Sequence, residues 1–174
     1  MLTQVQEKFH WSKAVWGRFN IPKHSFILWL AVQHRLKTRD RLSRFNIAED
    51  SACLLCAGAE ESGTHLFFEC SFSQECLYQM KTWLGWQAHT EALQGLLRWI
   101  DRSRRSRFQK KVLAASIASL VYHVWQARNS KLWHSSIISP TLLVQEARWQ
   151  LKTRITCIMP KQIDQVDKEW FESL

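Results

Sequence analysis

Hydrophobic residues recur at the spacing of α-helices along most of this chain of 174 residues. In the longest such stretch Leu113, Ile117, Leu120 and Val124 follow one another every three or four positions, which places them on one face of a helix. Prolines at first-turn positions favour two further helix starts. The pattern predicts helices over residues 22–34, 39–45, 64–85, 107–134, 140–158 and 163–171.

Residues 46–64 interrupt this helical pattern. They contain two glycines and most of a group of acidic residues, which indicates a loop or small knuckle, and only residues 52–55 have an extended character. In the helix predicted over residues 22–34, Phe26, Trp29 and Leu30 share one face. In the helix after it, we expect the inward side chains to include Leu66, Cys70 and Leu77. A mainly α fold follows.

The composition excludes several classes of protein. Hydrophobic residues make up 46% of the chain and ten residues are Trp, against five Gly and three Pro, which excludes a disordered, linker-like or collagen-like chain. The longest nearly charge-free apolar run, residues 112–125, is shorter than the about 20 residues that cross a bilayer, so we expect no membrane span. Five Cys without a secretory signal argue against a disulfide framework and favour the nucleus or cytoplasm.

Charge is unevenly distributed along the chain. The formal net charge is +9, and residues 1–48 carry a net +7 and residues 98–111 a net +6, whereas residues 49–70 carry a net −5. Two basic blocks on either side of an acidic segment attract polyanions, because neutralising phosphates releases their condensed counterions. The alternative is that these charges only solvate exposed helix faces.

Four residues between the basic blocks have the spacing of a metal site, Cys53-x2-Cys56-x8-His65-x4-Cys70. Two thiolates separated by two residues can bind one ion from a tight turn, and a His and a Cys can complete a tetrahedron. Three sulfurs and one imidazole favour zinc in a closed, structural site. The alternative is four unrelated residues in a Cys-containing segment.

The neighbouring acidic residues and the two remaining cysteines allow more than one interpretation. The acidic group either raises the affinity for a dication or is ordinary loop surface; its members are Glu49, Asp50, Glu60, Glu61 and Glu69. Cys76 and Cys157 are interpreted as small buried apolar side chains and not as ligands.

The residues around this spacing resemble a known family, the zinc-binding domain that follows the polymerase in plant LINE-type (non-LTR) retrotransposon reverse transcriptases. The likeness is carried by residues 16–42, by Cys-Leu-Leu-Cys at 53–56, by His-Leu-Phe-Phe-Glu-Cys at 65–70, and by the Trp-x2-Arg-Asn pattern within residues 124–133. It extends over about residues 11–135, and the metal-binding segment is its most specific part. The resemblance implies a zinc cofactor bound by Cys53, Cys56, His65 and Cys70.

The polymerase activity of that family is not implied for this chain. The Tyr-x-Asp-Asp sequence of a polymerase palm is missing, and the five Asp residues do not cluster, so neither a polymerase nor a ribonuclease H two-metal site can be assembled. The histidines outside the metal spacing lack an adjacent nucleophile or a Gly-rich phosphate loop; they are His10, His24, His34, His89, His123 and His134. We expect the accessory domain to stand alone, without enzymatic activity.

Two functions remain open on these residues. The first is binding of RNA or DNA, in which phosphate contacts dominate and sequence preference is slight. The candidate contact residues are Arg35, Lys37, Arg39, Arg41, Arg44, Arg102, Arg104, Arg105, Arg107, Lys110 and Lys111. Aromatic residues such as Trp29 and Phe67 are more typical of a core than of base stacking.

The second function is a domesticated, retrotransposon-derived regulator that acts through a host protein partner. Ten Trp exceed what a small core needs, and part of the set, such as Trp83, Trp86 and Trp99, would form an exposed interaction patch that also permits self-association.

The expected architecture joins these observations. It is a helical domain with a small zinc knuckle between N-terminal helices and a C-terminal helical bundle. Residues 1–85 contain the N-terminal helices and the zinc-binding region, with the knuckle at residues 50–72. Residues 86–174 form the C-terminal helical region, which we expect to pack with the first as one unit.

Overall fold

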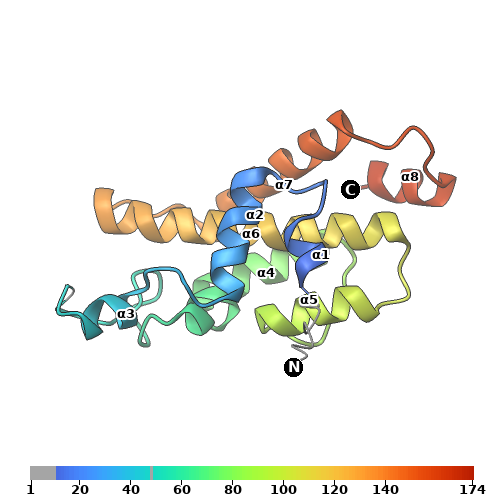
Figure 1. The fold of residues 1–174 in the computed structure, drawn as a ribbon. Helices are drawn as coiled ribbons and strands as arrows, with labels where there is room; N and C mark the ends of the chain where they lie inside the picture. The colour runs from blue at the N-terminus through green and yellow to red at the C-terminus, as the bar shows by residue number, and fades with distance from the viewer. Residues whose placement is uncertain (1–10, 48) are drawn as a thin grey trace, which may run out of the picture.

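The computed structural model describes residues 11–47 and 49–174 (Figure 1). Its helices in chain order are α1 (Ser12–Val15), α2 (Pro22–Val32), α3 (Arg39–Arg44), the short π-helical segment η1 (His65–Glu69), α4 (Ser71–Trp83), α5 (Leu93–Arg102), α6 (Arg107–His134), α7 (Pro140–Cys157) and α8 (Gln165–Glu172). The described residues contain no β-strand, and one isolated antiparallel bridge pairs Ala52 with Glu60. The mainly α prediction is therefore confirmed.

The longest helix, α6, lies at the centre of the molecule (Figure 1). Both α2 and α7 pack against it, and α1, α4 and α5 also contact it. From Val112 to Val121 every residue of α6 is buried, and about half of these residues are Ala or Ser, whose small side chains let neighbouring helices approach on several sides. Ser106 caps the helix start by accepting a hydrogen bond from the Gln109 amide at 3.0 Å.

The aromatic face of α2 is the outer face of that helix. Its buried residues include Leu28, Ala31 and Val32, which pack toward α6, whereas the Phe26 side chain is 51% exposed and Trp29 is half-buried. The helix thus buries its smaller aliphatic residues against α6 and leaves the larger rings outside. Phe67, the other aromatic residue assigned to the core, is buried.

The single helix predicted over residues 64–85 is wrong, because the backbone leaves helical geometry at Phe67 and Phe68 within η1 and is extended at Cys70, before α4. Phe68 has a φ of 85°, in the left-handed region, and its amide donates to the Ser73 hydroxyl at 3.0 Å. The Cys70 amide donates to the His65 carbonyl at 2.7 Å, so one tight turn replaces a helical one. The inward positions of Leu66, Cys70 and Leu77 are confirmed.

The sequence patterns did not predict α5, although its apolar residues have helical spacing. Leu93, Leu96, Leu97 and Ile100 are all buried along one face. The predicted helices nearer the C-terminus lie where expected: α7 begins after the Ser139 cap and ends at Cys157, and α8 is close to its predicted range. Within the described part of the chain, no helix has the length and apolarity needed to cross a bilayer.

Candidate metal centre

The four predicted ligands converge at one point, and their ligand atoms all lie within 4.8 Å of one another. The Cys53 and Cys70 sulfurs are 3.9 Å apart, and the Cys56 sulfur is 3.3 Å from His65 Nε2. With Zn–S bonds of about 2.3 Å, two sulfurs on a tetrahedral zinc are separated by about 3.8 Å. The separation of the first pair therefore fits a tetrahedral zinc site.

A tight turn presents the first two sulfurs. The Ala57 amide donates to the Cys53 carbonyl at 2.8 Å, and Ala57 itself has a left-handed φ of 54°. The Gly58 amide then points at the Cys56 sulfur, 3.5 Å away. The Cys53 amide donates to the Ala59 carbonyl at 2.8 Å, which closes the loop. Backbone amides directed at sulfur stabilise the thiolate form that a metal requires.

The turn at Phe67 and Phe68, within η1, presents the other two ligands. In a continuous helix, His65 and Cys70 would be five positions apart and on different faces. The Ser73 hydroxyl donates to the Cys70 carbonyl at 3.1 Å and accepts the Phe68 amide, so it stabilises the turn from inside the core. The His65 amide donates to the Ser62 hydroxyl at 3.0 Å, which anchors the start of η1.

The electrostatics of the two buried cysteines favour a cation. The hydrogen bond from the Cys70 thiol, assisted by the backbone amides of Cys56 and Leu55 and opposed by burial, lowers the pKa of Cys53 to about 5. The same bond and burial raise the pKa of Cys70. A zinc ion bound here would require both sulfurs as thiolates, because the deprotonated form of cysteine is the ligand.

The comparison with known families agrees with this geometry. Residues 1–76 match a family model described as zinc-binding in reverse transcriptase. This segment contains all four ligands and supports a reverse transcriptase zinc-binding domain with zinc as the cofactor. The match covers the zinc-binding part of reverse transcriptase and does not include the polymerase, so the match itself does not point to an enzymatic role. No curated protein and no solved structure is significantly similar to the chain.

A buried ion pair connects the zinc-binding domain to α6. Glu61 is fully buried, and its Oε1 accepts hydrogen bonds from Arg128 Nε at 2.9 Å and Nη2 at 2.8 Å. The same oxygen accepts the Arg39 amide at 3.0 Å, and Oε2 accepts the Leu54 amide at 3.3 Å. One carboxylate thus joins the metal-binding turn, the start of α3 and α6. The interpretation of Glu61 as loop surface is therefore wrong.

The other acidic residues of this segment are exposed, as loop surface is. Glu49, Asp50, Glu60 and Glu69 all lie at the surface.

The two cysteines outside the site differ in burial. Cys76 is fully buried, as predicted, and burial raises the pKa of its thiol to about 12. Cys157, at the end of α7, is exposed, so the prediction of burial is wrong for this residue.

Two candidate residues of the first basic block are already bound within the protein. The Arg39 guanidinium donates to the Ala52 carbonyl at 2.9 Å and lies 3.5 Å from the Asp50 carboxylate. Arg41 donates to the His34 carbonyl. These two side chains therefore connect α3 to its surroundings.

The remaining residues of the first block face solvent. Lys37 is exposed, and the Arg44 side chain is 77% exposed and 3.9 Å from Asp40. The exposed Arg35 places its guanidinium 5.7 Å from the centre of the Trp29 ring. A hollow of about 480 Å³ lies between α2, α3 and the start of η1, and its lining includes Arg35, Arg41 and Arg44.

The second basic block surrounds the corner between α5 and α6. Two of its members bind backbone carbonyls: Arg105 that of Gly85 at 2.8 Å, and Lys110 that of Asp101 at 2.8 Å. The exposed members are Arg102, Arg104, Arg107 and Lys111. Arg98 lies beside Arg102 on α5 and belongs to the same surface, although it was not among the candidate contacts.

Two buried histidines lie apart from the metal centre. The rings of His24 and His123 are 5.4 Å apart, and neither Nε2 has a hydrogen-bond partner. Burial, assisted by His123 and Lys23, lowers the pKa of His24 to about 3, and burial also lowers the pKa of His123. Both are therefore neutral in the folded protein near pH 7. His10 lies outside the described residues.

Proposed function

We propose that this chain is a zinc-stabilised nucleic-acid-binding module that contacts RNA or DNA through its basic helices and has no enzymatic activity. Zinc in a closed set of four ligands leaves no position open for catalysis, so the metal would serve to hold the fold. We also propose that the chain derives from a plant LINE-type retrotransposon, that it functions without the polymerase, and that it acts in the nucleus or cytoplasm.

The observation that carries this proposal is the concentration of basic side chains in hollows at the α5–α6 corner. A hollow of about 550 Å³ between α1, α5 and α6 has five basic side chains and one carboxylate in its lining. The basic ones are Lys13, Arg18, Arg107, Lys110 and Lys111, and the carboxylate is Asp101. A set with this excess of positive charge attracts phosphate. The excess is larger than the solvation of an exposed helix face requires.

Binding of fluorescently labelled RNA and DNA, measured by anisotropy across a salt series, tests the proposal. We expect binding at about 50 mM salt and a loss of about a thousandfold or more by about 200 mM, as six or more phosphate contacts require. Exchanging Arg102, Arg104 and Arg107 for Ser should weaken binding to all sequences alike. An absence of binding at about 50 mM salt would refute the proposal.

A separate observation favours the second candidate function, a regulator that acts through a host protein partner. Apolar side chains are exposed where α6 ends and α7 begins, with Trp133 75% and Leu142 55% exposed. This apolar patch consists of Leu132, Trp133, Ile137, Ile138 and Leu142. It lies elsewhere than the sequence suggested, because Trp86 is buried and Trp83 and Trp99 pack partly against the core.

An affinity pulldown from native tissue, with and without nuclease, distinguishes the two functions. Partners that remain after nuclease treatment and are lost with Trp133→Ser would favour the regulator. Partners that disappear with nuclease would favour nucleic-acid binding. Light scattering of the purified chain over a concentration series tests whether the patch also supports self-association.

A further inference from the structure

A large basic hollow lies beside α5. It has a volume of about 1040 Å³ and is bounded by the loop between α4 and α5, by the outer face of α5 and by the start of α6. Its lining includes Arg98, Arg102, Arg104 and Arg105, and no carboxylate is among the residues that line it. The hollow lies outside residues 1–76, the segment that matches the zinc-binding family.

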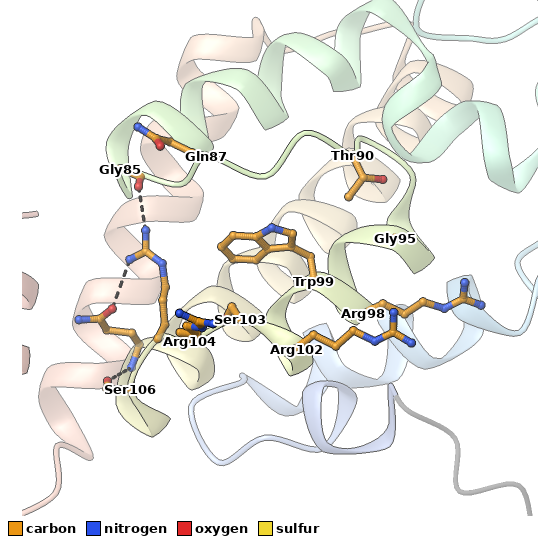
Figure 2. Close-up of a pocket in the computed structure, with 12 residues that line it drawn as sticks. Gly85, Gln87, Thr90, Gly95, Arg98, Trp99, Arg102, Ser103, Arg104 and Ser106 are labelled. Carbon is orange, nitrogen blue, oxygen red and sulfur yellow. Dashed lines mark hydrogen bonds between the residues drawn. The ribbon is translucent and has the colours of Figure 1, made fainter.

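An aromatic ring lies at the centre of this basic hollow. Figure 2 shows the Trp99 indole between Gln87 on one side and Arg98 and Arg102 on the other. The ring packs against Trp86, with 5.6 Å between centroids, and Trp99 remains half-buried. An indole fixed on one side and accessible on the other can stack with a planar ligand without a large loss of side-chain entropy.

Two of the arginines are free to bind an anion. Arg98 and Arg102 are exposed and one helical turn apart on α5, so their side chains lie next to each other on the same face. Arg105 instead donates to the Gly85 carbonyl at 2.8 Å and to Gln109 at 3.3 Å, and so connects the α4–α5 loop to α6. These hydrogen bonds of Arg105 fix the backbone on this side of the hollow, while the guanidinium groups of Arg98 and Arg102 remain available for an anion.

The wall of the hollow is also closely packed at Gly95. A Cβ at this position would lie 2.3 Å from the Thr90 hydroxyl oxygen and 3.2 Å from Thr90 Cβ. A larger residue at position 95 would therefore force the Thr90 side chain to shift, and both residues line the hollow. Asp167, which is not among the lining residues, accepts hydrogen bonds from two residues that are, Ser106 at 2.8 Å and Gln109 at 3.0 Å.

We propose that this hollow binds single-stranded nucleic acid, with one base stacked on the Trp99 indole and the adjacent phosphates bound by Arg98 and Arg102. This inference rests on the proposed nucleic-acid-binding function and assigns it a site and a preference. Aromatic rings combined with a basic groove are the means by which proteins bind single strands with little sequence preference. A duplex fits poorly, because its bases are stacked inside and cannot reach a ring within a hollow.

Short oligonucleotides and three variants of the full chain test the proposal. The probes are labelled RNA and DNA strands of about eight nucleotides, within the range of about 4–16 that one small domain covers, and a duplex of the same length. Trp99→Ala should weaken single-strand binding about fivefold or more and leave duplex binding unchanged, whereas Trp99→Tyr should restore most of the affinity. Arg98→Ala with Arg102→Ala should lower the slope of log K against log salt by about 1.4, since each single-strand phosphate contact contributes about 0.7.

A matched control removes two charges elsewhere. Lys131→Ala with Lys152→Ala changes the net charge equally, and neither residue lines the hollow. We expect its slope to stay near that of the unaltered chain. Equal effects of the control and the arginine pair, equal losses for single strand and duplex, or full binding by Trp99→Ala would overturn the inference.

The outcomes also separate this inference from the function on which it rests. If the unaltered chain binds no nucleic acid, both fail. If it binds but the hollow variants bind equally well, only the inference fails, and exchanging Lys13, Arg18 and Lys111 in the neighbouring basic hollow should then weaken binding. Because the Trp99 variant can lose stability through Trp86, its urea midpoint is measured beside its affinity. The variant that replaces Arg98 and Arg102 tests the site without disturbing core packing, because both side chains are exposed.

Discussion

Replacing Arg128 by Leu tests the buried ion pair that connects Glu61, in the metal-binding segment, to α6. The change leaves the Glu61 carboxylate fully buried without its counter-charge. The pair has two charge-assisted hydrogen bonds, at 2.9 and 2.8 Å. At about 1.5–3 kcal/mol each, their loss amounts to about 3–6 kcal/mol, in agreement with the about 3–5 kcal/mol typical of a broken buried pair.

The free energy of unfolding measured by urea titration, with zinc saturating, should therefore fall by about 3–5 kcal/mol. For a chain of this size the corresponding decrease in Tm is about 6–20 °C, at about 2–4 °C for each kcal/mol. The exposed pair Lys168–Glu172, 3.9 Å apart with side chains 48% and 63% exposed, provides the control. Glu172→Gln should change stability by no more than about 1 kcal/mol.

Arg128→Leu should also weaken zinc binding, because Glu61 accepts the Leu54 amide within the metal-binding turn. Competition with a chromogenic chelator measures this effect, and the Glu172 variant should not show it. A free energy of unfolding within about 1 kcal/mol of that of the unaltered chain would mean that other groups stabilise the Glu61 carboxylate when Arg128 is absent. The reasoning from burial would then be refuted.

Three further predictions concern the metal centre and the core. Cys53→Ser with Cys56→Ser should abolish stoichiometric zinc, measured by atomic emission; retention of the metal would exclude these ligands. Ser73→Ala leaves the Phe68 amide without its buried acceptor and should lower the free energy of unfolding by about 1–3 kcal/mol in urea titrations; an unchanged midpoint would contradict this. The pKa of His24 is about 3 in the folded chain against about 6.5 unfolded, so the unfolded chain binds the proton first as pH falls through this window. At pH values below about 6.5, the free energy of unfolding should decrease by up to about 1.4 kcal/mol for each pH unit, and the decrease should be shallower in His24→Phe. Above about pH 7 the two proteins should show the same slope. Parallel slopes below about pH 6.5 would refute the assignment.

The ligand set could be predicted from the sequence because it depends on local spacing. Cys53 and Cys56 belong to one turn, and His65 and Cys70 follow within a short distance along the chain. The partner of Glu61 could not be found in this way, since Arg128 lies 67 residues away and only the packing of α6 brings it near. A surface glutamate and one with a buried counter-charge look identical in an acidic loop.

Local patterns failed where two signals competed in one segment. The strong basic run over residues 98–111 overlaps the end of α5 and interrupts its apolar pattern, although the spacing of Leu93, Leu96 and Ile100 is helical. At Phe68 the apolar residues continue a helical pattern although the backbone turns. The buried hydrogen bonds of Ser73 and the approach of His65 to Cys70 decide the conformation there, and helix propensity does not.

The length of α6 sets a spacing for any strand that would engage both basic regions. From Arg107 near the α5–α6 corner to Arg128 beside the zinc-binding domain, the helix rises about 32 Å, at about 1.5 Å per residue. A stacked strand with about 3.4 Å per nucleotide needs about nine nucleotides to cover that separation. Shorter strands reach one region only, and longer ones gain a second attachment at high effective concentration. Affinity plotted against strand length should therefore rise steeply near about nine nucleotides.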